Sequence, residues 1–174
     1  LVLYISVQNA EIVTDPLTGL YNRRQTDSYL QGLIQGTPRA GGIRLAILDV
    51  DNFKQINDRY GHLTGDRALR TLASVLRSEC ARDTFCSRYG GDEFVIVTRH
   101  GGRDQLEALL ARIDERLDEC CGTLGEQFRL SISVGAAAWS AHTDTADTLF
   151  AAADKELYLN KRKLKRRATD QDEG

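Results

Sequence analysis

Residues 84–98 have the sequence TFCSRYGGDEFVIVT, and this stretch decides the fold. Two segments with many β-branched and aromatic residues, Thr84 to Tyr89 and Glu93 to Thr98, lie on either side of the pair Gly90-Gly91. Because a glycine pair between two such segments is typical of a tight turn, the stretch predicts a β-hairpin. At least part of the sheet is therefore expected to be antiparallel.

The segments around the hairpin predict the rest of the fold. The apolar run from Ile43 to Val50 and the alternating run from Phe128 to Ala137 indicate two more strands. Helices are expected near Asn22 to Gln35, Phe53 to Arg59, Asp66 to Glu79, Leu106 to Leu117 and Thr145 to about Lys165. With the extra helices set aside, the N-terminal one among them, the order is β-α-β-β-α-β. This order predicts an α+β fold of the split-βαβ (ferredoxin-like, palm-like) type, an antiparallel sheet with helices packed on one face.

Composition limits the class of protein. The chain has 174 residues, of which 41% are hydrophobic and 28% charged, as expected for one globular domain rather than a disordered or multi-span membrane protein. The net charge of -2 gives no overall basic field, so no nucleic-acid partner is expected, and we expect the basic run from Lys161 to Arg167 to be a solvated helix end. The opening run Leu1 to Val7 is far shorter than the roughly 20 apolar residues of a membrane helix. Since methionine is absent, we expect the chain to be a piece of a longer protein.

The four cysteines, Cys80, Cys86, Cys120 and Cys121, form no C-x-x-C pair. The three histidines are scattered, so a zinc site is not expected. Reduced, mostly buried thiols in a cytosolic domain are the expectation.

Two acidic clusters carry the chemistry. Asp49 lies where the first predicted strand ends, and Asp92 and Glu93 lie on the hairpin. In the split-βαβ fold both places are in the middle of the sheet, so these carboxylates are expected to converge. Carboxylates packed closely raise one another's pKa unless a cation neutralises them. Oxygen ligands without thiolate or imidazole favour Mg²⁺ or Mn²⁺, and the adjacent glycines suggest a phosphate substrate.

Other acidic motifs fit less well. Asp49-Val50-Asp51 resembles the start of an EF-hand, but Phe53 and Lys54 occupy positions where that loop needs a ligand and a glycine. No P-loop motif is present. An aspartate-nucleophile phosphatase, which also has Asp-x-Asp at a strand end, stays an alternative. It would release phosphate from small phosphoesters, but its sheet is parallel.

The segment Arg88 to Phe94, RYGGDEF, resembles the signature of the GGDEF family, the diguanylate cyclases. Other segments also match the family, so the resemblance extends from about Asp15 to Lys165. The matching segments are Asp15 to Arg24, Asp49 to Lys54, Asn57-Asp58, Gly61-His62, Gly65-Asp66, Ser131 to Gly135 and Ala153 to Tyr158.

The resemblance implies an enzyme that condenses two GTP molecules into cyclic di-GMP and two pyrophosphates, with Mg²⁺ or Mn²⁺. It implies catalytic roles for Asp92, Glu93 and Lys54, with Asp92 accepting the proton of the 3′-hydroxyl. It implies a metal site made by Asp49, the carbonyl of Val50, Asp92 and Glu93. The implied GTP-binding residues are Phe53, Asn57, His62, Asp66, Gly90, Gly91, Lys161 and Lys165, among which Asn57 and Asp66 would recognise guanine.

The resemblance also implies an organisation. Residues 1–14 would end an upstream linker or signalling helix, residues 15–167 would form the GGDEF nucleotidyl cyclase domain, and residues 168–174 would be a disordered tail. Activity would require a homodimer, driven by an upstream sensor domain, in the cytoplasm. The alternative is a catalytically silent GGDEF domain that binds GTP or cyclic di-GMP as a sensor.

Two departures from the family pattern are informative. At the Arg-x-x-Asp positions of the family's inhibitory site the chain has Ala81 and Thr84, so this site is expected to be missing or much weakened. Near the C-terminus, Lys165 replaces an arginine and Leu164 a glycine. Lysine keeps the charge but cannot form bidentate contacts, so weaker phosphate binding is expected there.

Overall fold

The computed structural model describes residues 13–36, 42–80, 82–99, 102–124, 128–140 and 145–172, with side chains described except at 121–124 and 165–172. The elements, in chain order, are α2 (Arg23–Gly36), β1 (Arg44–Val50), α3 (Phe53–Tyr60), α4 (His62–Glu79), β2 (Thr84–Arg88), β3 (Glu93–Thr98), α5 (Arg103–Leu124), β4 (Ile132–Ala138) and α6 (Ala146–Asp172).

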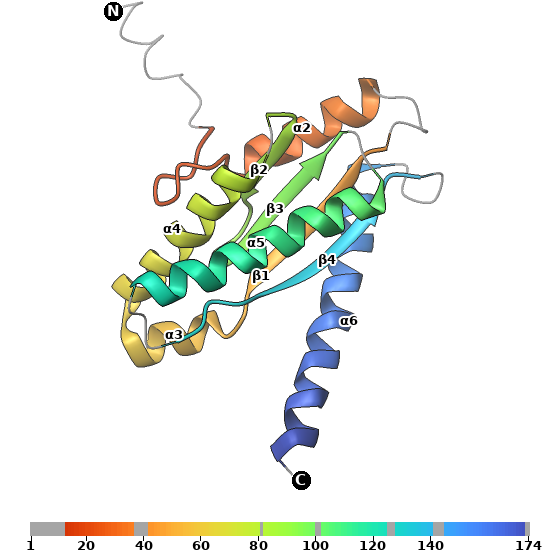
Figure 1. Cartoon of the computed structure of the whole chain (residues 1–174). Helices are drawn as coiled ribbons and strands as arrows, with labels where there is room; N and C mark the ends of the chain where they lie inside the picture. Colours follow the sequence, from red (N-terminus) through yellow and green to blue (C-terminus); the bar gives the residue numbers. More distant parts are fainter. Residues whose placement is uncertain are drawn as a thin grey trace, which may run out of the picture.

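The four strands form one sheet in the order β2-β3-β1-β4, with every neighbouring pair antiparallel (Figure 1). The β-hairpin predicted from Gly90-Gly91 joins β2 to β3, and the α+β split-βαβ fold is confirmed. Because β1 and β3 are the central strands, the end of β1 lies beside the hairpin. The register pairs Asp49 with Glu93 of β3 and with Ser133 of β4.

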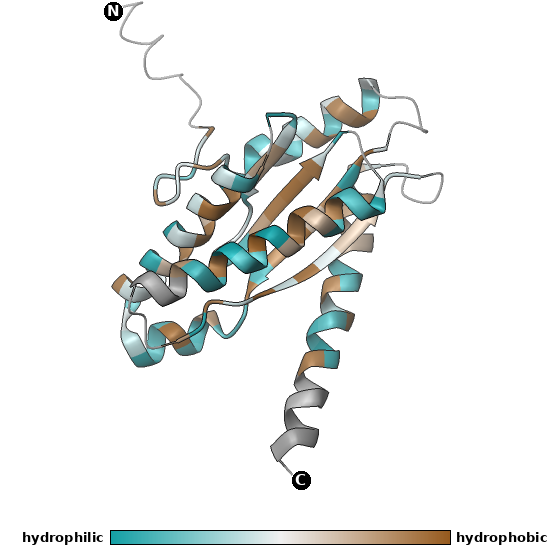
Figure 2. Cartoon of the chain, in the orientation of Figure 1, coloured by the Kyte–Doolittle hydropathy of each residue, from teal (hydrophilic) through white to brown (hydrophobic). Residues whose placement is uncertain are grey.

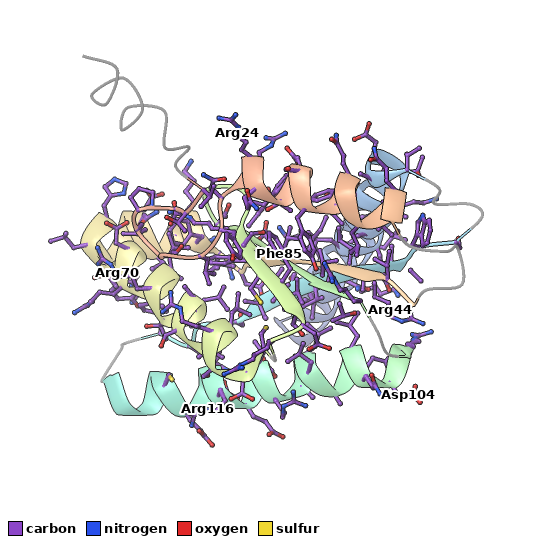
Figure 3. All side chains as sticks on the ribbon, turned by 90° about the horizontal axis from the view of Figure 1, so that it is seen from above. Arg24, Arg44, Arg70, Phe85, Asp104 and Arg116 are labelled. Carbon is purple, nitrogen blue, oxygen red and sulfur yellow. The ribbon has the colours of Figure 1, made fainter. Side chains whose placement is uncertain are left out.

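Helices cover both faces of the sheet, and the prediction of helices on one face was wrong. One core joins Leu48 of β1 and Phe94 of β3 to residues of α4 and α5. A second core joins Leu45 and Val95 of the same strands to residues of α2 and α6. Figure 3 shows α2 on one side of the sheet and α4 and α5 on the other. The continuous apolar run of β1 is typical of a strand buried on both faces, and these strands are brown in Figure 2.

Several element ends differ from the prediction, and α5 extends beyond both of its expected ends, to Arg103 and Leu124. The second crossover helix, α4, begins at His62, directly after Gly61, whose φ of 85° separates it from α3. β4 begins only at Ile132, because Phe128 stacks on Tyr60 of α3, with ring centroids 5.2 Å apart, instead of joining the sheet. α6 continues to Asp172, so residues 168–172 of the expected tail are helical. The opening run at residues 1–7 lies outside the described residues.

Within the described ranges, no helix has both the length and the apolar character that crossing a membrane requires.

Candidate functional site

The predicted meeting of β1 and the hairpin is seen in the backbone and in the side chains. The Val50 N–H donates to the carbonyl oxygen of Asp92 at 3.1 Å, which fixes the hairpin turn to the end of β1. Asp49 and Glu93 are direct cross-strand partners, and Asp49 is only 8% exposed. Two carboxylates from distant parts of the sequence are therefore held side by side at one end of the central strands.

A lysine from the last helix reaches the same place. Lys161 Nζ lies 2.7 Å from Asp49 Oδ1. Asn160, its neighbour, donates from Nδ2 to the Val134 carbonyl of β4 at 2.8 Å, which ties α6 to the sheet at this level. The family resemblance pointed to Lys161, but not to its ion pair with Asp49.

Gly135 allows α6 to approach the sheet and was missed as a site residue. A Cβ added at Gly135 would overlap the backbone of Ala153 and Leu157 in α6. Any side chain there would push the helix, and Lys161 with it, away from β4. The available signal was a glycine inside a strand, which often marks a close backbone approach.

The electrostatics of the carboxylates agree with a cation site. Burial raises the pKa of Asp49, and the nearby Asp92 and Asp51 raise it further, while Lys161 acts in the opposite direction. Burial, Asp49 and Asp92 likewise raise the pKa of Glu93. Excess negative charge is therefore only partly compensated by Lys161.

Asp51 is a second residue whose part in the site was missed. Its carboxylate accepts hydrogen bonds from Ser131 Oγ at 2.9 Å and Ser133 Oγ at 2.5 Å, and its N–H donates to the Ser131 carbonyl at 2.9 Å. These bonds fasten the turn after β1 to the start of β4. A pocket of about 440 Å³ opens beside them, lined by Asp49, Asp51, Asn52, Ser131, Ser133, Lys161 and Leu164.

The two hairpin glycines differ in their surroundings. A Cβ at Gly90 would come within 2.7 Å of Glu93 Oε2, whereas a Cβ at Gly91 would meet nothing within 4 Å. Arg88 Nη2 donates to the Gly91 carbonyl at 2.7 Å, and this hydrogen bond stabilises the turn. Gly91 therefore presents bare, exposed backbone to the solvent.

Arg88 also connects the hairpin to the N-terminal turn. Its Nη1 lies 3.1 Å from Asp15 Oδ1, and Asp15 accepts further hydrogen bonds from the N–H and Oγ1 of Thr18. Burial alone would raise the pKa of Asp15, but these bonds and the Arg88 guanidinium outweigh it, so the pKa is lowered. The N-terminal turn at Asp15 is thus bonded directly to the last residue of β2, just before the hairpin turn.

The residues expected to contact the base lie on α3 and at the start of α4. Asn57 and Asp66 are half-buried, and a Cβ at the buried Gly65 would overlap the Asn57 side chain. The absence of a side chain at Gly65 therefore lets Asn57 lie against the first turn of α4. Phe53 packs against the core, whereas Lys54 and His62 are exposed.

The remaining expected positions can be placed only in part. Thr84 begins β2, whereas Ala81 and the side chain of Lys165 lie outside what the structure describes. Within the described residues, no three His, Cys, Asp or Glu side chains are gathered tightly enough to hold a metal ion by themselves.

The observed donors nevertheless fit a divalent cation. Asp49 and Glu93 supply hard oxygen atoms, and the ammonium of Lys161 already stands against Asp49 as a cation would.

Comparison with known proteins agrees with the geometry. Residues 12–167 match the family model described as "Diguanylate cyclase, GGDEF domain". The chain therefore belongs to the GGDEF family. Its relatives include the diguanylate cyclase DgcP of Pseudomonas aeruginosa, 35% identical over 161 residues that make up 91% of this chain and 24% of that protein. Another is the diguanylate cyclase DosC of Escherichia coli, 35% identical over 168 residues, 95% of this chain and 36% of that protein.

The chain thus spans only about a quarter to a third of the length of these relatives. Among solved structures, it resembles the GGDEF domain of DgcB from Caulobacter crescentus in complex with c-di-GMP. The TM-score is 0.80 and the identity 31%, over 88% of this chain and 92% of that chain.

Proposed function

We propose that this domain is a diguanylate cyclase that condenses two GTP molecules into cyclic di-GMP with release of two pyrophosphates. The observation that carries the proposal is the cross-strand pair of the buried Asp49 and the half-buried Glu93, which lies beside a hairpin with open backbone at Gly91. Their raised pKa values indicate a place that favours added positive charge. A nucleoside triphosphate binds together with a divalent cation, and that cation supplies the positive charge that the carboxylates favour.

The metal would be Mg²⁺ or Mn²⁺, held by Asp49, Glu93, Asp92 and the carbonyl of Val50. When bound, such an ion neutralises phosphate charge and lowers the pKa of an attacking hydroxyl. Without it, Lys161 shares the charge of Asp49.

The chain's own residues would carry out the rest of the chemistry. Asp92 would accept the proton of the 3′-hydroxyl, whose oxygen attacks the α-phosphate of the second GTP as pyrophosphate leaves. Lys54, Lys161 and Lys165 would stabilise the phosphates. Gly90 and Gly91 would let the backbone approach them.

Specificity for GTP would come from α3 and α4. The Asp66 carboxylate can accept from the N1–H and N2–H₂ groups of guanine, which adenine does not present. Asn57 would contact the same base, with Phe53 and His62 nearby.

One domain binds one GTP in this mechanism, so activity would require a homodimer of facing domains. Residues 15–167 would form the catalytic unit, and an upstream sensor would act through the preceding segment and the turn at Asp15. We place the domain in the cytoplasm, where GTP is available. Feedback at the Arg-x-x-Asp positions would be missing or much weakened, because Ala81 and Thr84 offer no replacement for the bidentate contact between arginine and phosphate.

Chromatography of GTP incubated with the protein and Mg²⁺ tests the proposal. The unaltered chain should give a cyclic dinucleotide peak. Asp92→Asn should give none, and Asp104→Asn, an exposed change on α5, should match the unaltered chain. No product from any form, with GTP still bound, would favour the silent sensor instead, and phosphate released from small phosphoesters would favour a phosphatase.

A further inference from the structure

Two cysteines outside the nucleotide site face each other across the end of α4. Cys80 follows the last residue of the helix, and its N–H donates to the Leu76 carbonyl at 3.0 Å. Cys86 lies in the middle of β2, paired with Ile96 of β3. The Cys86 Sγ lies 2.8 Å from the Cys80 Sγ, and both thiols are free.

We propose that Cys80 and Cys86 form a thiol-oxidation site, at which a peroxide converts the two thiols reversibly into a disulfide. The proposal does not depend on the cyclase activity. A disulfide requires two sulfur atoms at about 2.05 Å with their Cβ atoms facing. Here both backbones are already fixed, one by a helix end and one by strand pairing, with the sulfur atoms adjacent. Only a small displacement therefore separates the free thiols from the bonded state.

The two thiols differ in exposure, which sets the order of steps. Cys86 is buried, and its hydrogen bond to Cys80 together with burial raises the pKa of its thiol. Cys80 is half-buried, so oxidant reaches it first.

The Cys80 thiolate attacks one oxygen of hydrogen peroxide, the O–O bond breaks, and the departing hydroxide takes up a proton to become water. Cys80 is then a sulfenic acid.

Cys86 completes the reaction. Its sulfur attacks the sulfenic sulfur of Cys80, the S–S bond forms, and the S–O bond breaks. The hydroxyl leaves as water with the proton of the Cys86 thiol. In sum, two thiols and one hydrogen peroxide give one disulfide and two waters, with two electrons passing from sulfur to peroxide. A dithiol reductant reverses the change by thiol–disulfide exchange.

The disulfide would close a covalent loop that contains residues 81–85, and it would link the end of α4 directly to β2. The strand β2 leads straight to the Gly90-Gly91 turn, and α4 carries Asp66 in its first turns. Oxidation would therefore connect two elements that each extend to the nucleotide site.

Peptide mapping tests the site directly, because trypsin cleaves after Arg77, Arg82 and Arg88 and so separates the two cysteines. The folded chain is treated with a few equivalents of hydrogen peroxide, its remaining thiols are blocked with N-ethylmaleimide, and it is digested without reductant. Peptides 78–82 and 83–88 should appear as one linked species lacking two hydrogen atoms and should separate after reduction. This species should exceed any other cysteine pairing at least about tenfold.

Variants and an unfolded control complete the test. Cys80→Ala and Cys86→Ala should each abolish the linked species, whereas Cys120→Ala should retain it. Chain unfolded in guanidinium before oxidation should give mixed pairings. The proposal fails if the folded chain gives the same mixture, or if both thiols remain open to N-ethylmaleimide after oxidation. Because the comparison of folded and unfolded unaltered chain is sufficient to test the proposal, a variant that fails to fold does not affect the conclusion.

Discussion

Gly91 is the residue where the hairpin leaves open backbone. Since a Cβ there would meet no other atom within 4 Å, Gly91→Ala should leave the fold intact, with a melting temperature within about 1 °C of the unaltered chain. The added methyl group would instead obstruct a ligand that touches the backbone, so GTP binding should weaken about tenfold or more. Thermal melting and isothermal titration with GTP and Mg²⁺ measure the two effects. Equal affinity in both proteins would mean that the ligand does not approach this residue.

Glu93 shows the cost of the site's charge. Its folded-state pKa is raised above the ordinary 4.5, so its ionised form destabilises the fold at every pH above that raised value. The penalty disappears as the pH falls from the raised value toward 4.5. Without metal, Glu93→Gln should therefore melt about 1–3 °C higher at pH 8, and the gain should vanish near pH 4.

Glu115→Gln, an exposed change on α5, is the matched control and should show no such pH-dependent gain. A Glu93→Gln protein less stable than the unaltered chain at pH 8 would show that the carboxylate is not under electrostatic stress.

At the scale of elements, the position of α6 depends on Gly135. A methyl group there would strike the helix backbone, so Gly135→Ala should cost about 1–3 kcal/mol of unfolding free energy and should displace Lys161 from Asp49. Cyclase activity should also fall, because Lys161 would no longer lie beside Asp49. Gly32→Ala in α2 is the control, because nothing lies within 4 Å and alanine favours helix by about 0.5–1 kcal/mol. Chemical denaturation of both variants distinguishes the outcomes, and an unchanged Gly135→Ala protein would refute the packing role.

The sequence predicted well the elements that depend on local signals. It did not predict the features that depend on contacts between distant segments. Glu93 to Thr98 was predicted with the observed bounds because a glycine pair and β-branched residues act locally. The late start of β4 depends on Phe128 stacking on Tyr60, a contact between distant segments. The second face of the sheet is covered because α2 and α6 pack on it. The continuous apolar pattern of the strands is compatible with this packing, but it does not indicate which helices take part.

For the site, topology alone was enough to bring Asp49 beside the hairpin, because both occupy the centre of the sheet. The Lys161 ion pair and the bonds from Ser131 and Ser133 to Asp51 join residues about 80 or more positions apart. Such contacts form only in the folded chain, so the sequence did not predict them. Residue type suggested their chemistry, but no spacing rule predicted which acid each would contact.

For the whole molecule, the proposed mechanism makes activity depend on two domains. Because each domain would hold one of the two GTP molecules, the initial rate per mole of protein should rise with protein concentration and level off once dimers dominate. Initial rates over about a hundredfold range of protein concentration measure this. A constant specific rate from a protein shown to be monomeric would contradict the requirement for facing domains.

The most direct test is the metal dependence of cyclic di-GMP formation, measured across a Mg²⁺ titration for the unaltered chain, Glu93→Gln and Asp104→Asn. If carboxylates of β1 and β3 hold the cation under the phosphates, Glu93→Gln should lose at least about a hundredfold in rate at low Mg²⁺ and recover in part at high Mg²⁺. Asp104→Asn should follow the unaltered chain throughout. Superimposable curves for all three proteins would contradict the account.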